Sequence, residues 1–158
     1  MDTILASPPR RRSDHYALVR NVEGAVLMVA TTYQRGLVLP GGSAESNELP
    51  HLAARRHVEI VTGLVLPLKD VVAVDHTEGN VFPERLTLVF DGGTATEDHE
   101  AAVMRHLLPD DVKSLFWVKG HDIPILMDPH YARLVEQALT AVDRRTVLPL
   151  LLGGMPAI

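Results

Sequence analysis

The residues best suited to chemistry in this chain surround one glycine-containing loop and the helix expected after it. Pro40–Gly42 is a cluster of structure breakers that predicts a loop, and Glu48, Arg56, His57 and Glu59 follow it. Carboxylates can bind hard cations or accept protons, and a histidine can ligate a transition metal. This segment is therefore the first candidate for a catalytic or metal-binding site.

The same side chains also have an ordinary structural interpretation. His57 stands alone among apolar neighbours on the expected helix, a setting typical of a half-exposed histidine. Glu59 is typical of a solvated surface carboxylate. A second group, Glu97–Glu100, falls in a polar stretch that predicts a surface loop. Its acids could bind metal or act as a base, although a solvated acidic loop requires no such role.

Composition excludes several classes of function. The chain has no cysteine, which rules out disulfides, thiolate metal sites and a cysteine nucleophile. Its formal net charge of -5 offers no general basic field for nucleic acid, and we expect the local run Arg10–Arg12 to be a solvated arm. Met1–Pro9 does not resemble a secretory signal, so a cytoplasmic location is expected. The apolar run Val147–Leu152 is far shorter than the roughly 20 residues that span a bilayer, and no membrane association is expected.

Strands and helices must position these side chains. The apolar patterns predict strands at His15–Val19, Ala25–Thr32, Gly36–Leu39, Val65–Val74, Arg85–Asp91 and Ser114–Val118. They predict helices at Pro50–Val61, Glu100–Leu107 and Tyr131–Arg144, with Gly63 as a C-terminal cap of the first. Strands on both sides of a loop–helix unit, followed by a terminal helix, favour the α/β class with a mixed β-sheet.

The length of 158 residues favours a single domain. We assign residues 1–13 to an irregular N-terminal arm, residues 14–145 to the domain and residues 146–158 to an apolar C-terminal tail. The tail is expected to fold back over the domain. Its alternative is a contact with another partner or with a second copy, which would make the protein a homodimer.

Residues 42–64 resemble the Nudix box, whose family pattern is G-x5-E-x7-R-E-U-x-E-E-x-G-U with U an aliphatic residue. The matching positions, without insertion or deletion, are Gly42, Glu48, Arg56, Val58 and Gly63-Leu64. The resemblance implies a Nudix-like α/β/α sandwich. It also implies that Glu48 and Arg56 tie the loop to the helix by a charge-assisted hydrogen bond.

The departures from the pattern fall on the family's metal ligands. His57, Ile60 and Val61 stand where the family has three glutamates that bind Mg²⁺ or Mn²⁺ from one helix face. Ile60 and Val61 offer no oxygen, charge or proton. We therefore assign no metal ligand and expect no cofactor, except Mg²⁺ or Mn²⁺ if the chain proves to be an active enzyme.

Three functions are consistent with these residues. The favoured one is a Nudix-superfamily protein with a degenerate metal site that binds a nucleotide-like or other small ligand and hydrolyses it weakly or not at all. The first alternative is an active hydrolase of a nucleoside diphosphate derivative, and the second is a protein-interaction module with Ile60 and Val61 on its contact surface. The candidate catalytic residues are Glu48, His57 and Glu59. The candidate ligand-binding residues are Gly41, Gly42, Arg56, Asp98 and Glu100, the last two because some family members carry an extra glutamate in that part of the chain.

Overall fold

The computed structural model describes residues 10–81, 83–149, 151–152 and 155–156, which form a mixed sheet with helices on both faces and a separate two-stranded sheet near the C-terminus. The strands are β1 (Arg12–Arg20), β2 (Val26–Thr31), β3 (Gly41–Ser43), β4 (Asp70–Thr77), β5 (Arg85–Thr94), β6 (Val112–Val118), β7 (Leu148–Pro149), β8 (Leu151–Leu152) and β9 (Met155–Pro156). The helices are α2 (Pro50–Thr62), α3 (Glu97–Arg105), the 3-10 turn η1 (Gly120–Asp122), α4 (Ile123–Leu126) and α5 (Pro129–Arg144). The predicted α/β class with a mixed sheet is confirmed.

Strand β1 lies near the centre of the sheet. The strand order is β6-β2-β1-β5-β4-β7, with β3 paired to β1 outside this path. Strands β1 and β5 are parallel, whereas β1 pairs antiparallel with β2 and β3. This parallel pairing brings residues about seventy positions apart into register, including Arg12 with Arg85.

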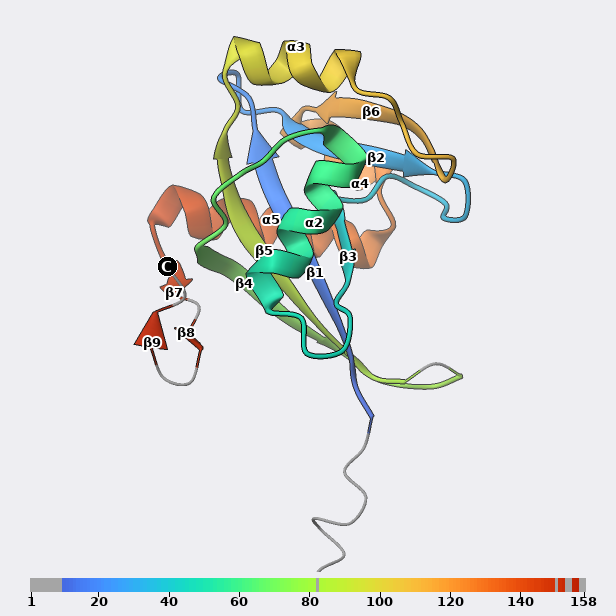
Figure 1. The fold of residues 1–158 in the computed structure, drawn as a ribbon, viewed down its shortest axis with the longest axis vertical. Helices are drawn as coiled ribbons and strands as arrows, with labels where there is room; N and C mark the ends of the chain where they lie inside the picture. Colours follow the sequence, from blue (N-terminus) through green and yellow to red (C-terminus); the bar gives the residue numbers. More distant parts are fainter. Residues whose placement is uncertain (1–9, 82, 150, 153–154, 157–158) are drawn as a thin grey trace, which may run out of the picture.

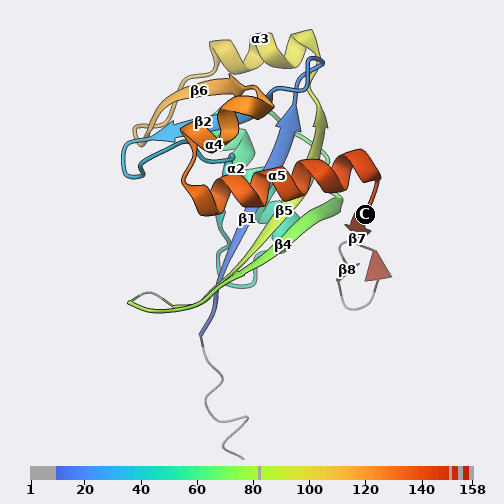
Figure 2. The same ribbon diagram turned by 180° about the vertical axis from the view of Figure 1, so that it is seen from behind.

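Alternate residues of β1 pack against helices on opposite faces, as the period of two in a strand requires. Ala17 and Val19 are fully buried in the cluster that includes α2, whereas Leu18 is fully buried in the cluster that includes α5. Figure 1 shows α2 in front of the sheet, and Figure 2 shows α5 across the other face. The three layers confirm the expected sandwich.

Helix α2 has the boundaries that its sequence predicts, to within one residue. Pro50 lies in its first turn, where the missing N–H removes no helical hydrogen bond. Gly63 adopts a left-handed conformation, with φ of 79°, and its N–H donates to the carbonyl of Glu59. Ala53, Ala54 and Val58 are buried, which directs this face of the helix onto the sheet.

The segment before α2 differs from the prediction. Gly36–Leu39, predicted as a strand, forms only an isolated bridge between Val38 and Val29. The strand in this segment is instead β3, at Gly41–Ser43, which overlaps the predicted loop. Gly41 has a φ of 152°, and a Cβ added there would collide with the backbone of His15. Glycine therefore permits the close approach to β1 that makes this segment a strand.

Two further boundaries differ from the prediction. Leu64, Leu66 and Leu68 are buried in alternation without a strand partner, so β4 begins only at Asp70. Helix α3 begins at Glu97, so the acidic cluster predicted on a loop forms its first helical turn. Thr96 explains this start, because its side chain accepts a hydrogen bond from the backbone N–H of His99.

Segments near both ends of the described chain, β1 and β7, belong to the main sheet. Strand β1 already contains Arg12 and Ser13, so the irregular segment is shorter than the predicted arm, whose residues 1–9 lie outside the described residues. Arg10, Arg11 and Arg12 are exposed, as predicted, and the last two are also ion-paired with Glu84 and Asp14. At the other end, β7 pairs with the edge of β4, so this part of the tail does fold back. Among the described residues no helix is long and apolar enough to cross a membrane.

Candidate functional site

A cleft of about 450 Å³ opens beside the predicted loop–helix unit. One wall is built by β3 and α2 and includes Gly41, Gly42 and His57. The rest of the lining includes residues from the start of β1 and the start of β5, and Tyr131 of α5. Since helix and sheet elements distant in sequence converge here with polar and aromatic side chains, the cleft is the candidate ligand site.

His57 is fixed against the glycine strand. Its Nε2 donates to the carbonyl of Ser43 at 2.9 Å, and the ring packs so closely on Gly42 that a Cβ there would lie 2.6 Å from Cε1. The hydrogen bond occupies Nε2 and fixes the orientation of the ring. Ring and strand thereby form a packed surface on this wall of the cleft.

Glu48 and Arg56 form the ion pair implied by the resemblance. The Nε of Arg56 donates to Oε2 of Glu48 at 2.8 Å, and its Nη2 donates to Oε1 at 2.9 Å. Glu48 also accepts from the backbone N–H of Glu45. The hydrogen bonding with Arg56, and secondly that from Glu45, lowers the pKa of Glu48 to about 2. Glu48 and Arg56 do not line the cleft. Their two parallel hydrogen bonds hold the loop to α2.

The helix face that holds metal in the family offers a poor donor set here. Val61 lines the cleft, whereas Ile60 is 51% exposed and does not, and Glu59 is also exposed. Within the described ranges, no three histidine, aspartate or glutamate side chains converge. One histidine whose Nε2 is already bonded, with two aliphatic side chains, does not fit a hard divalent cation that requires several oxygens.

The acidic residues of α3 lie away from this wall. Asp98 and Glu100 do not line the cleft, and Glu100 accepts from Nδ2 of Asn21 at 3.0 Å. Figure 1 shows α3 over one end of the sheet, beyond the tip of the β1–β2 hairpin. The structure therefore does not bring Asp98 or Glu100 together with His57.

Four further side chains line the cleft that the sequence did not mark as candidates. Arg12 and Arg85 both line the cleft, as do Tyr33 and Tyr131. The guanidinium of Arg85 stacks over the ring of Tyr131, with its Cζ 5.8 Å from the centroid. No local motif marks this group, because the register of β1 with β5 assembles it.

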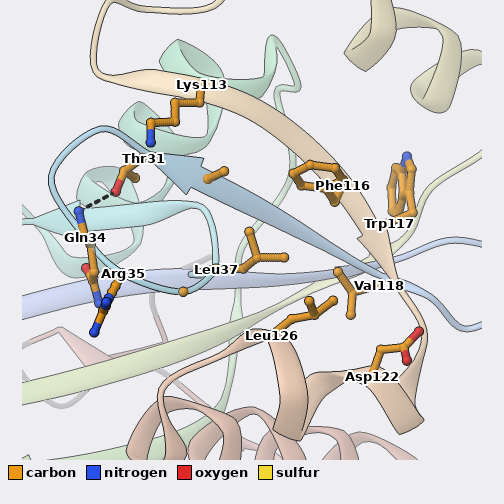
Figure 3. A pocket seen from close by; sticks show the side chains of 12 residues that line it. Thr31, Gln34, Arg35, Leu37, Lys113, Phe116, Trp117, Val118, Asp122 and Leu126 are labelled. Carbon is orange, nitrogen blue, oxygen red and sulfur yellow. Dashed lines mark hydrogen bonds between the residues drawn. The ribbon is translucent and has the colours of Figure 1, made fainter.

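A second cavity, of about 550 Å³, lies on the other side of the loop after β2. Figure 3 shows its apolar lining, which includes Leu37, Phe116 and Leu126. Arg35, near the same loop, lines this cavity and not the cleft. Thr31 and Gln34 line both. None of the predicted site residues lies in this cavity, so we place the candidate site in the cleft.

The three-layer fold, with the loop–helix unit beside a cleft, defines a Nudix-type domain. A family model of the NUDIX domain matches residues 10–138, and the chain therefore belongs to the Nudix family. No match to a curated protein is found.

Solved structures show the same fold at low sequence identity. The MutT protein from Methanosarcina mazei Go1 has a TM-score of 0.70 at 22% identity, covering 89% of this chain and 99% of its own. A NUDIX hydrolase from Nitrosomonas europaea has a TM-score of 0.71 at 19% identity, covering 89% and 94%. The NUDIX domain of Shewanella oneidensis NrtR, solved with ADP ribose, has a TM-score of 0.65 at 14% identity, covering 90% and 94%.

Proposed function

We propose that this protein binds a nucleotide-like ligand in the cleft and hydrolyses it weakly or not at all by the family's usual metal-dependent route. The observation that carries the proposal is the helix wall of the cleft. It presents His57, bonded to Ser43, and the aliphatic Val61, so the side chains that would attract a divalent cation are missing.

The proposal of a nucleotide-like ligand is supported by the remaining walls. Aromatic rings can stack on a base, and guanidinium groups can bind phosphate oxygens in pairs. Tyr33, Tyr131, Arg12 and Arg85 supply both kinds of group. The related NrtR domain was solved with ADP ribose, and another solved structure of this fold is a UDP-X diphosphatase, so nucleoside diphosphate derivatives are the first ligands to test.

Calorimetric titration with Mg²⁺ and Mn²⁺ tests the missing metal site. We expect no saturable binding by the wild-type protein. The triple variant H57E/I60E/V61E should gain binding, because it restores three carboxylates at positions i, i+3 and i+4 of the helix. The variant H57Q/I60Q/V61Q is the matched control, since it adds similar polarity without charge and should bind no metal.

A turnover assay separates this proposal from the active-enzyme alternative. A panel of nucleoside diphosphate derivatives, including ADP-ribose, is incubated with protein and Mn²⁺ or Mg²⁺, and nucleotide release is measured. We expect binding without appreciable turnover. Metal-dependent turnover that disappears in His57→Ala or Glu48→Gln, but not in Asp98→Asn, would contradict the proposal and assign the reaction to the loop–helix unit.

A further inference from the structure

Two arginines from neighbouring strands face the same cleft. Arg12 of β1 and Arg85 of β5 are register partners in the parallel pair, so their side chains leave the sheet on one face. Both line the cleft, and both also line an adjoining hollow of about 460 Å³. The pair therefore lies where the two hollows meet.

Asp14 holds this pair but does not neutralise it. The carboxylate is completely buried, and its Oδ1 accepts from Nε of Arg12 and from Oγ of Ser43, each at 2.9 Å. Its Oδ2 lies 3.7 Å from Nη1 of Arg85 and has no hydrogen-bond partner among the described residues. One carboxylate thus faces two guanidinium groups, so these three side chains together carry one net positive charge.

The hydrogen-bonding capacity of the two arginines is largely unused. Arg12 spends its Nε on Asp14 and Ser43, and its side chain is 52% exposed. Within the part of the chain that the structure describes, the Arg85 side chain makes no hydrogen bond, and its contacts are the stacking on Tyr131 and the 3.7 Å approach of Nη1 to Asp14. The buried carboxylate of Asp14 holds both guanidinium groups in place, and their Nη groups remain available to donate hydrogen bonds to phosphate oxygens.

We infer that Arg12 and Arg85 bind the diphosphate of a nucleotide directly, in place of the divalent cation that the family uses. The inference rests on the proposed function and adds how the ligand is held. Tyr33 and Tyr131 line both hollows next to the arginines, where a base or sugar could stack. The acids Asp111 and Glu78 also line these hollows, so the anion is recognised by the arginine pair and not by a broad positive field.

Calorimetric titration of ADP into the full chain tests the inference, with EDTA or with Mg²⁺ in the buffer. We expect equal affinity in both buffers. R12Q and R85Q should each raise Kd by about tenfold or more, because a charged hydrogen bond is lost. R35Q is the matched control: Arg35 lines the other cavity, and its removal should leave Kd unchanged.

The conservative variant R85K separates a loss of ADP binding from a loss of folding. Lysine retains the charge opposite Asp14 but lacks the planar fork, so its Kd should lie between those of the wild type and R85Q. Thermal unfolding without ligand confirms that each variant is folded. The proposed role of the arginine pair would be wrong if wild-type binding required Mg²⁺, or if R12Q and R85Q bound ADP as tightly as R35Q. In either case nucleotide binding itself would still stand. A wild-type protein that binds neither ADP, ADP-ribose nor pyrophosphate would overturn the proposed function itself.

Discussion

At the scale of single residues, Glu48 is a structural carboxylate. Both of its oxygens accept from Arg56, and the backbone N–H of Glu45 adds a further hydrogen bond. A base whose pKa is held near 2 has little affinity for a proton at neutral pH. The position is therefore suited to fixing the loop on α2.

Substitution of Glu48 by glutamine should lower the free energy of unfolding by about 1–2 kcal/mol at neutral pH, because a charge-assisted pair becomes a neutral hydrogen bond. The pKa of Glu48 is lowered on folding, so its contribution is present above the unfolded pKa, near 4.5, and is lost as the pH falls toward 2. Urea unfolding of both proteins across this range should show the difference shrinking with acid. Glu59→Gln, an exposed carboxylate on α2, is the control. A difference independent of pH would contradict this assignment.

Two pairs of residues differ in how far the sequence could predict them. Glu48 and Arg56 are eight positions apart on a loop and its helix, and the resemblance to the Nudix box implied the ion pair that the structure contains. Arg12 and Arg85 have no such spacing. They meet because β1 and β5 pair in parallel, and a sequence without homologues carries no signal for that register.

At the scale of elements, the start of α3 shows how one cap sets a boundary. Thr96 accepts from the backbone N–H of His99, and Nδ1 of His99 accepts from the backbone N–H of Thr96. The usual capping box has glutamate or glutamine in the position of His99, so the sequence pattern did not reveal it. Glu97, Asp98 and Glu100 then occupy the first turn, where negative charge is favourable to the helix dipole.

Substitution of Thr96 by alanine should therefore destabilise the protein by about 1 kcal/mol, the usual cost of a lost N-cap. Thr96→Ser retains the hydroxyl and should remain within a few tenths of a kcal/mol of the wild type. Denaturant unfolding measures both. Amide hydrogen exchange in α3 should increase in the alanine variant alone, and equal protection in the two variants would refute the capping role.

At the scale of the whole molecule, a buried histidine links stability to pH. His15 is 1% exposed between β1 and the elements that cover it, and its Nε2 hydrogen-bonds Oγ of Ser13 at 2.6 Å. Burial lowers its pKa, against the opposing influence of Asp14 and Glu48. The native state therefore retains the neutral imidazole, and protonation favours the unfolded chain.

We expect the free energy of unfolding to fall as the pH drops below the unfolded pKa of histidine, about 6.5, because there the unfolded state binds the proton more readily. His15→Gln should reduce this slope between about pH 7 and pH 5. His121→Gln removes an exposed histidine and is the control. Urea unfolding at several pH values gives the slopes. An unchanged slope in His15→Gln would mean that other groups cause the acid sensitivity.

Features that depend on neighbouring residues along the chain could be predicted from the amino-acid sequence. Pro50 and Gly63 set the ends of α2, and the residues that match the box pattern pointed to the Nudix family. These predictions succeeded because caps, turns and periodicity are local interactions.

The lining of the cleft, in contrast, depends on contacts between distant parts of the chain. Parallel pairing of β1 with β5 brings Arg12, Asp14 and Arg85 together, and α5 adds Tyr131 from the far end of the chain. The close approach of Gly41 to His15 likewise turns a predicted loop into β3. Such contacts depend on strand order and register, which the burial of the whole sheet selects and no short stretch of sequence encodes.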